Sequence, residues 1–255
     1  MAAGKFRFGL WRGACLVAAV ALFVVSGCKL WGYYAESRES ALLVEQLAEM
    51  AVESLPEGES APITVDFAAL CAENSDVVGW LYCEDTPINY PVVQAGDNER
   101  YLRRLIDGSR NAAGSLFVDW RNSGDFSDAN TVIYGHNMRN DSMFGTLPRY
   151  AEPGYYKQHP VIFLLTPAAD YRLDILGGFT AADAELYNVP MADYAVADFA
   201  AETVRKSDFA ADADFDALFD EGDRLLTLST CSYEYDGARY VLVGVLHRLD
   251  TQDAE

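Results

Sequence analysis

Short runs of apolar and β-branched residues, separated by turn residues, fill the chain from Val65 onwards. Such runs are short for helices, and their mixture of Val, Ile, Leu, Phe and Tyr is typical of strands. Many short strands at close spacing, with few helices between them, predict a mainly β fold of the α+β class, in which a barrel or sandwich carries added helices. The predicted strands are 77–83, 88–94, 114–120, 131–134, 160–167, 171–179, 225–230 and 240–246.

Helical spacing is confined to a few segments. Residues 34–52 repeat apolar positions with Glu between them, which predicts an amphipathic helix, and Asp66 can cap a short helix that ends near Asn74. The connection over 180–223 is rich in Ala and Asp, and it predicts an acidic helix that closes one side of the sheet. The remaining helical patterns are at 98–105, 194–204 and 215–219.

The N-terminus has the pattern of a membrane-targeting segment. An almost uncharged apolar run over residues 13–28 can extend to Tyr34 if Lys29 snorkels. Basic residues before such a run predict a cytoplasmic N-terminus and an external body. These basic residues are Lys5, Arg7 and Arg12.

Two interpretations of this segment stay open. It is an uncleaved signal anchor or a lipoprotein signal, because Val25-Ser26-Gly27-Cys28 resembles a lipobox whose cysteine would be acylated. Both tether the body outside the cytoplasm. We therefore divide the chain into a cytoplasmic tail and anchor at 1–34, a helical stalk and linker at 35–64, and a folded domain at 65–255. The stalk helix either stands near the membrane or packs on the domain.

The chain is strongly acidic, with a formal net charge of −20 over its 255 residues and a pI of about 4.4. A nucleic-acid-binding surface needs a basic footprint, so this class of function is set aside. Hydrophobic residues make up 51% of the chain, enough for a substantial core in one large domain or two small ones.

The cysteines give limited information about chemistry. Cys15 and Cys28 belong to the targeting segment, and the body holds Cys71, Cys83 and Cys231, so at least one thiol stays free unless chains pair. Cys71 and Cys83 either form a bridge or remain as buried thiols, the commoner state in apolar settings. Because no Cys/His cluster has metal-ligand spacing, we expect no structural metal and no cofactor.

The first chemical stretch lies near the C-terminus. The turn signal Asp236-Gly237 between two strand-like runs predicts neighbouring antiparallel strands. Cys231 then ends one strand and Arg239 begins the next, at the same mouth of the sheet. A cationic neighbour favours a thiolate, and Arg is a fixed donor for a developing oxyanion. Taken singly, Cys231 would be an inert thiol and Arg239 a surface charge.

The second chemical stretch surrounds His136. The strand over 131–134 ends in Gly135, which lets the chain turn and present His136 at the strand end. Of the other two histidines, His159 sits in a polar loop and His247 lies beyond the last strand, near the C-terminus. An isolated histidine would be a turn residue, but this setting makes His136 the candidate base and acid.

Several motifs resemble those of sortases, the membrane-anchored cysteine transpeptidases of Gram-positive bacteria. Thr227-Leu-Ser-Thr-Cys231 is similar to their TLxTC signature, and Tyr134-Gly-His-Asn-Met138 matches their histidine segment. Further segments resemble the class B branch. These are Ser232-Tyr-Glu234, Arg239 eight residues after Cys231, Asp141–Leu147, Gly79–Leu81 and Asn89–Val92.

The resemblance implies a closed β-barrel of roughly seven to eight strands, an N-terminal helical extension, an uncleaved anchor and a helix in the connection before the Cys strand. It also implies that Cys231 attacks a threonine carbonyl of a sorting signal, that His136 protonates the leaving amine, and that Arg239 stabilises the oxyanion. The partners would be a surface protein or pilin that bears the signal and an amine of peptidoglycan or of a pilin. The substrate-binding residues implied with these are Asn98, Leu102, Tyr134, Tyr187, Ser229 and Glu234.

Two other classes of function remain open. A cysteine hydrolase would use the same thiolate and imidazole but release its product to water. A membrane-tethered binding or adhesion domain would carry an inert site, although such a domain has no reason to keep Cys231, His136 and Arg239 together. An acceptor amine distinguishes the transpeptidase from the hydrolase, because only the transpeptidase incorporates it.

Overall fold

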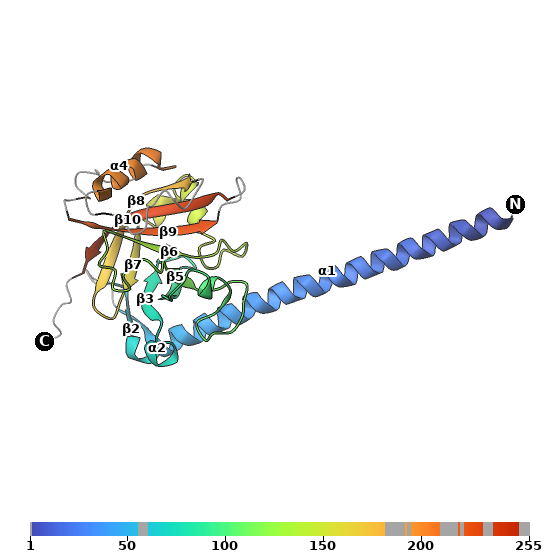
Figure 1. Ribbon diagram of the computed structural model, residues 1–255, viewed down its shortest axis with the longest axis horizontal. Helices are drawn as coiled ribbons and strands as arrows, with labels where there is room; N and C mark the ends of the chain where they lie inside the picture. Colours follow the sequence, from blue (N-terminus) through green and yellow to red (C-terminus); the bar gives the residue numbers. More distant parts are fainter. Residues whose placement is uncertain are drawn as a thin grey trace.

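The fold is that of a computed structural model, in which a long helix joins a strand-rich body (Figure 1). The structure describes residues 2–55, 61–181, 192, 195–209, 219, 222–231 and 237–249. Side chains are described for these residues except 2–12, 14 and 231.

The body is built on a closed barrel with the strand order β10-β8-β7-β3-β4-β5-β6-β9 (Figure 1). The pairs β4–β5 and β6–β9 are parallel, and the other neighbouring pairs are antiparallel. Every barrel strand overlaps the strand predicted for it, and the mainly β class with a closed barrel is confirmed. The bounds are β3 Val77–Tyr82, β4 Asn89–Val93, β5 Leu116–Val118, β6 Asn130–Tyr134, β7 Val161–Leu165, β8 Asp170–Ala181, β9 Arg224–Cys231 and β10 Arg239–Arg248.

Alternate residues of these strands face opposite sides of the sheet, as the two-residue period of a strand requires. Ile133 and Leu228 belong to the core cluster that fills the barrel. Val132 and Val241 belong to a second cluster, which also contains residues of helix α4. All four side chains are fully buried, so both faces of this part of the sheet are covered by apolar groups.

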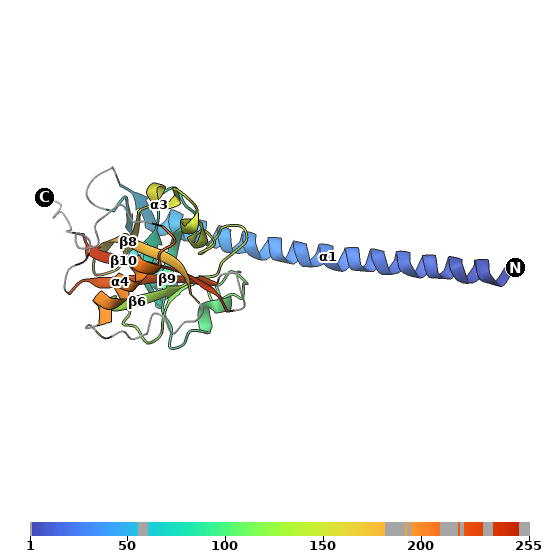
Figure 2. The same cartoon turned by 90° about the horizontal axis from the view of Figure 1, so that it is seen from above.

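Helix α4 (Val196–Lys206) lies in the connection between β8 and β9, where a helix is predicted. Figure 2 shows it lying across the barrel strands, and it contacts β8 and β9. Val196, Phe199 and Ala200 are buried at helical spacing, so one face of α4 closes the outside of the barrel. The predicted helical pattern at 215–219 falls almost entirely outside the described residues.

Helix α1 (Ala2–Ala51) is continuous, so the predicted anchor and stalk share one helix. The part from Cys15 is long and apolar enough to cross a membrane, with a mean hydropathy of 1.9 over its most apolar window, and none of that window is buried. Further along, Ser40, Leu47 and Ala51 are buried against the body. The second half of α1 therefore packs on the domain, which decides between the two arrangements that the sequence left open.

A short hairpin follows α1 at the position of the predicted linker. Strand β1 (Val52–Ser54) pairs with β2 (Ile63–Val65), and residues 56–60 between them lie outside the described part. Helix α2 (Phe67–Glu73) begins as predicted, because the Asp66 carboxylate accepts the Ala69 N–H at 3.0 Å. The helix predicted over 98–105 is a short 3-10 helix. The short helices are η1 Arg100–Arg103, η2 Leu147–Ala151 and α3 Tyr155–Gln158.

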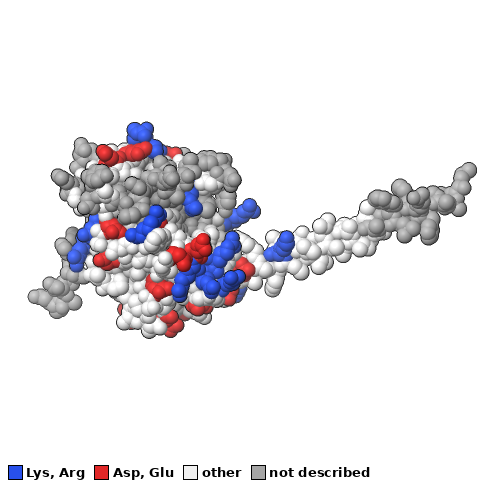
Figure 3. All heavy atoms as spheres, in the orientation of Figure 1, with Lys and Arg blue, Asp and Glu red and all other residues white. Residues whose placement is uncertain are grey.

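Basic side chains gather beside the junction of α1 with the body on the face shown in Figure 3. Exposed Arg100, Arg103, Arg104 and Arg110 line a hollow together with Glu36 of α1. Other acidic side chains line the same hollow, so its charge is mixed and does not form a uniform basic surface.

Candidate active site

Three strand ends meet at one end of the barrel. Strands β6 and β9 are parallel and both finish there, whereas β10 begins there because it is antiparallel to β9, with Arg239 opposite Cys231. The Gly135 N–H donates to the Ser229 carbonyl at 3.1 Å and extends the β6–β9 pairing by one residue. The backbone positions of His136, Cys231 and Arg239 therefore lie at the same end of three adjacent strands.

The His136 ring is held by a backbone carbonyl of η1. Its Nε2 lies 2.6 Å from the carbonyl oxygen of Leu102. A carbonyl can only accept a hydrogen bond, so this contact puts a proton on Nε2. Gly114 makes room for that carbonyl: its φ is +59°, and a Cβ there would lie 2.7 Å from the Leu102 oxygen. A side chain at position 114 would displace the group that orients the imidazole.

The backbone on both sides of His136 is also fixed. A Cβ on Gly135 would collide with the Leu116 and Phe144 side chains, so only glycine fits before the histidine. The Phe144 N–H donates to the His136 carbonyl at 3.0 Å, which closes the following loop onto it. A tight loop of this kind holds a side chain in one place without covering it, and His136 remains half-exposed.

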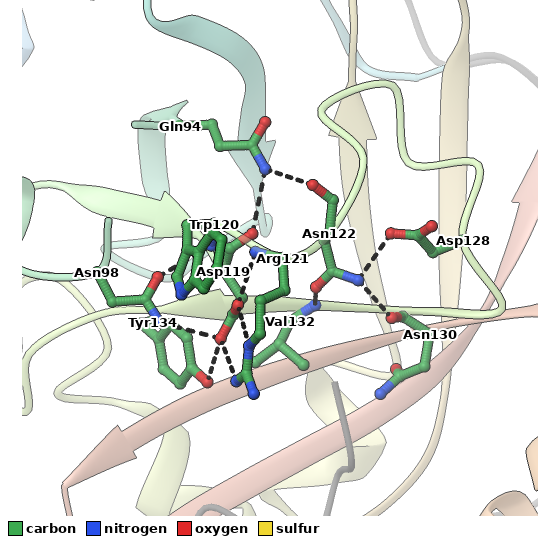
Figure 4. Close-up of polar contacts among 10 residues, drawn as sticks. All are labelled: Gln94, Asn98, Asp119, Trp120, Arg121, Asn122, Asp128, Asn130, Val132 and Tyr134. Atoms are coloured by element: carbon green, nitrogen blue, oxygen red, sulfur yellow. Dashed lines mark hydrogen bonds and ion pairs between the residues drawn. The ribbon is translucent and has the colours of Figure 1, made fainter. Parts of the chain in front are cut away.

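A buried carboxylate connects the predicted substrate-binding residues Asn98 and Tyr134 (Figure 4). Asp119 is fully buried and accepts hydrogen bonds from Asn98 Nδ2 and from the Tyr134 hydroxyl, both at 3.0 Å. Arg121 forms a two-pronged ion pair with it, through Nε and a terminal nitrogen, each at 2.9 Å. Burial by itself raises the pKa of Asp119, but hydrogen bonds from Arg121, Asn98 and Tyr134 together bring it below the ordinary value.

The remaining predicted substrate residues are distributed as follows. Leu102 is exposed and contacts His136 through its carbonyl, while Ser229 is buried in β9 directly opposite Tyr134 of β6. Tyr187 and Glu234 lie outside the described residues, as does the Cys231 side chain. The structure therefore brings Asn98, Leu102, Tyr134 and Ser229 to the same region, and their roles in binding stay predictions.

Sequence reasoning missed the centre of this region. Asp119, Trp120 and Arg121 follow β5 directly. Asp119 and Trp120 were predicted only as the end of a strand, and no role was predicted for Arg121. A charged pair two residues apart, immediately after the fully apolar β5, was the available signal. It was weak because many strands end in charged turn residues.

The two other body cysteines are free thiols. Cys83 is buried, and its sulfur lies 3.6 Å from the Val161 carbonyl. Burial raises the pKa of this thiol from 9.0 to about 11, partly offset by hydrogen bonds from Thr86 and Tyr150. Cys83 therefore stays protonated at neutral pH and has the character of a structural thiol.

Cys83 is expected to resist thiol reagents at pH 7.5 in the folded chain and to react once the chain is unfolded. Because its pKa is raised, the Cys83 thiol holds its proton more tightly in the folded state than in the unfolded state. The contribution of this proton to the free energy of unfolding is complete below about pH 9 and is lost between about pH 9 and pH 11. Mass spectrometry of alkylated peptides measures the labelling. Urea titrations of wild type and Cys83→Ala across that pH range measure the loss of stability. Parallel pH profiles of stability for the two proteins would contradict a contribution from Cys83.

Comparison with known proteins connects this barrel to a family. The sortase domain model matches residues 81–247. Sortase B of Listeria monocytogenes is 29% identical over 251 residues, which cover 95% of this chain and 98% of that protein. Sortase B of Staphylococcus aureus is 28% identical over 221 residues, which cover 86% and 88%.

Solved structures agree with the sequence relatives. A structure of sortase B from Bacillus anthracis superposes with a TM-score of 0.70 and 30% identity, covering 86% of this chain and 100% of that chain. A sortase B–substrate complex from S. aureus gives a TM-score of 0.66 and 26% identity, with 87% and 97% covered. A closed barrel with these motifs at the shared end of β6, β9 and β10 is the architecture of the sortase transpeptidases. The chain belongs to the sortase family, in its class B branch.

Proposed function

We propose that this protein is a cysteine transpeptidase that cleaves a C-terminal sorting signal after threonine and transfers the carried protein to an amine of the cell wall or of a pilin. The observation that supports this best is the strand register, which has His136, Cys231 and Arg239 at one end of three adjacent strands. Membership in the class B sortases supports the same reaction class.

In the proposed first step, the Cys231 thiolate attacks the carbonyl carbon of the threonine and forms a tetrahedral oxyanion. Arg239 donates to this oxyanion, because a fixed guanidinium is a donor that needs no rearrangement when charge develops. The C–N bond then breaks, and His136 gives a proton to the leaving amine. The product of this step is a thioester on Cys231 and a released C-terminal peptide.

In the second step, an acceptor amine attacks the thioester carbonyl and gives its proton to His136, and the thiolate leaves. The contact between Nε2 and the Leu102 carbonyl supports one assignment of atoms. Nε2 keeps its proton, which is hydrogen-bonded to that carbonyl. Nδ1 is therefore the nitrogen that takes and returns the proton in both steps. His136 thus alternates between imidazole and imidazolium without rotating.

The proposed location is the outer face of the cell membrane, with α1 as an uncleaved single-pass anchor. The apolar part of α1 and the basic residues before it support this orientation. The partners are then a surface protein or pilin that carries the sorting signal and a peptidoglycan or pilin amine. Acylation of Cys28 after cleavage is the alternative, and the mass of the mature chain from a native membrane distinguishes the two.

The full chain in detergent, mixed with a panel of peptides that contain the scissile threonine, is expected to form a peptide–amine product when an amine acceptor is present. Each peptide is tested with and without triglycine or a lysine-containing peptide, and the products are identified by mass spectrometry. Protein alkylated beforehand with iodoacetamide is the control, because alkylation blocks the Cys231 thiol, and its circular dichroism spectrum is compared with that of untreated protein.

Each result of this experiment selects one function. Amine incorporation that disappears on alkylation supports transpeptidation and identifies the sorting motif. Cleavage without incorporation, at any acceptor concentration, favours the hydrolase. If no peptide of a broad panel is cleaved and none forms a thioester, the proposal is contradicted and an inert tethered domain is favoured.

A further inference from the structure

Trp120 is an unusual residue on the surface of the barrel. Its side chain is 53% exposed, although burying an aromatic ring of this size is strongly favourable. Beyond α1 and the adjoining Leu55, the described residues include only two other exposed large apolar side chains, Leu102 and Val204. The Leu102 carbonyl contacts His136 and the Trp120 N–H donates to Asn98, so two of these three residues are joined to predicted site residues.

The backbone at Trp120 is fixed by Asn98, one of the predicted substrate-binding residues. Its N–H donates to Asn98 Oδ1 at 2.9 Å, and Asn98 Nδ2 in turn donates to Asp119. Figure 4 shows Trp120 beside Asn98, Asp119 and Tyr134. An exposed aromatic residue on a rigid support loses little conformational entropy on binding a ligand, which is the usual setting of a binding hot spot.

The strand register gives the distance between Trp120 and the reacting groups. The Asp119 N–H donates to the Val132 carbonyl at 2.9 Å, so Trp120 lies near the level of Val132, four residues before His136. At the rise of a strand this is about 13 Å along β6 from the histidine. An extended peptide covers that distance with about four residues.

We propose that Trp120 forms a subsite for an apolar side chain of the sorting signal, upstream of the scissile threonine. This rests on the function proposed above and adds a contact to it. His136 protonates the leaving amine, so the segment downstream of the threonine passes the histidine. The upstream segment then extends toward the start of β6, where Trp120 presents its ring. Asp119 is the positioning residue, because it holds Asn98, which in turn fixes the Trp120 backbone.

The test uses the full chain in detergent and a series of peptides with one to five residues before the threonine. Trp120→Ala is expected to raise KM about tenfold for the longest peptides, the effect of a typical hot-spot contact, and to leave kcat within about twofold. The effect is expected to vanish once the contacting residue is removed from the peptide. Trp120→Phe is expected to retain most of the affinity, because it keeps an aromatic face.

Controls separate binding from folding and from chemistry. Leu55→Ala removes another exposed apolar side chain, directly after β1 and outside the barrel strands, and its KM is expected to stay unchanged. The rate at which a small methanethiosulfonate modifies Cys231 reports the integrity of the site without a peptide. Calorimetric binding to Cys231→Ala, with and without Trp120→Ala, tests the subsite even if no turnover occurs.

Three results would overturn the subsite. The first is a KM for Trp120→Ala within twofold of wild type, and the second is an equal effect on peptides of every length. The third is slower Cys231 modification in Trp120→Ala, which would make the residue structural. If wild type binds peptides without turnover and Trp120→Ala weakens that binding, the subsite stands and the proposed reaction fails. If the wild-type chain binds no peptide, both the Trp120 subsite and the proposed reaction are overturned.

Discussion

Cys231→Ala is expected to abolish peptide cleavage, amine transfer and the covalent peptide adduct. The proposed reaction passes through a thioester, and alanine offers no atom that can form one. Loss of a catalytic nucleophile typically lowers turnover by at least about ten-thousand-fold. Product formation and intact-mass analysis after incubation with peptide measure both losses.

The chain supplies its own matched control for this substitution. Cys83→Ala removes a buried thiol from the same barrel and is expected to leave amine transfer unchanged, although it lowers stability by about 1–2 kcal/mol through the lost packing. A Cys231→Ala protein that still transfers peptide to an amine would remove Cys231 from the mechanism. An active Cys231→Ala together with an inactive Cys83→Ala would show that Cys83, and not Cys231, is the nucleophile.

Asp119→Ala is expected to lower the free energy of unfolding by about 3 kcal/mol. The substitution leaves the Tyr134 hydroxyl and the Asn98 amide without their shared acceptor and breaks the ion pair with Arg121. Because 41% of the Arg121 side chain is exposed, water solvates part of the separated charge, which keeps the loss below that of a fully buried pair. Urea unfolding followed by circular dichroism measures it.

Measurements at acid pH and two further variants test whether the charge and hydrogen bonds of Asp119 cause this loss of stability. The hydrogen bonds that lower the pKa of Asp119 stabilise the folded state above the ordinary carboxyl pKa, and this contribution is lost as pH falls through the lowered value. Asp119→Asn is expected to remove that acid-dependent part of the stability. Asp125→Ala, an exposed carboxylate of the same loop, is expected to cost well under 1 kcal/mol. Equal losses for Asp119→Ala and Asp125→Ala would refute the role of the buried network.

Local patterns were sufficient to predict most elements of this protein. Strand positions follow from short apolar runs, and the cap of α2 follows from Asp66, because both depend on residues within a few positions of each other. The antiparallel pairing of β9 and β10 was also predictable, since a turn signal separates them. The continuity of α1 was not, because a helix can continue through a change from apolar to amphipathic pattern.

The sequence by itself determined the strand-rich class, the helix before the Cys strand, the apolar N-terminus and the motifs around His136 and Cys231. Tertiary structure alone decided that β6 and β9 are parallel neighbours, that α1 packs on the body, and that Asp119 joins Asn98 and Tyr134. The contacts that decide these features are long-range: His136 meets a carbonyl 34 positions away and Asn98 a carboxylate 21 positions away. No local period records such contacts, because their partners come together only when the barrel closes.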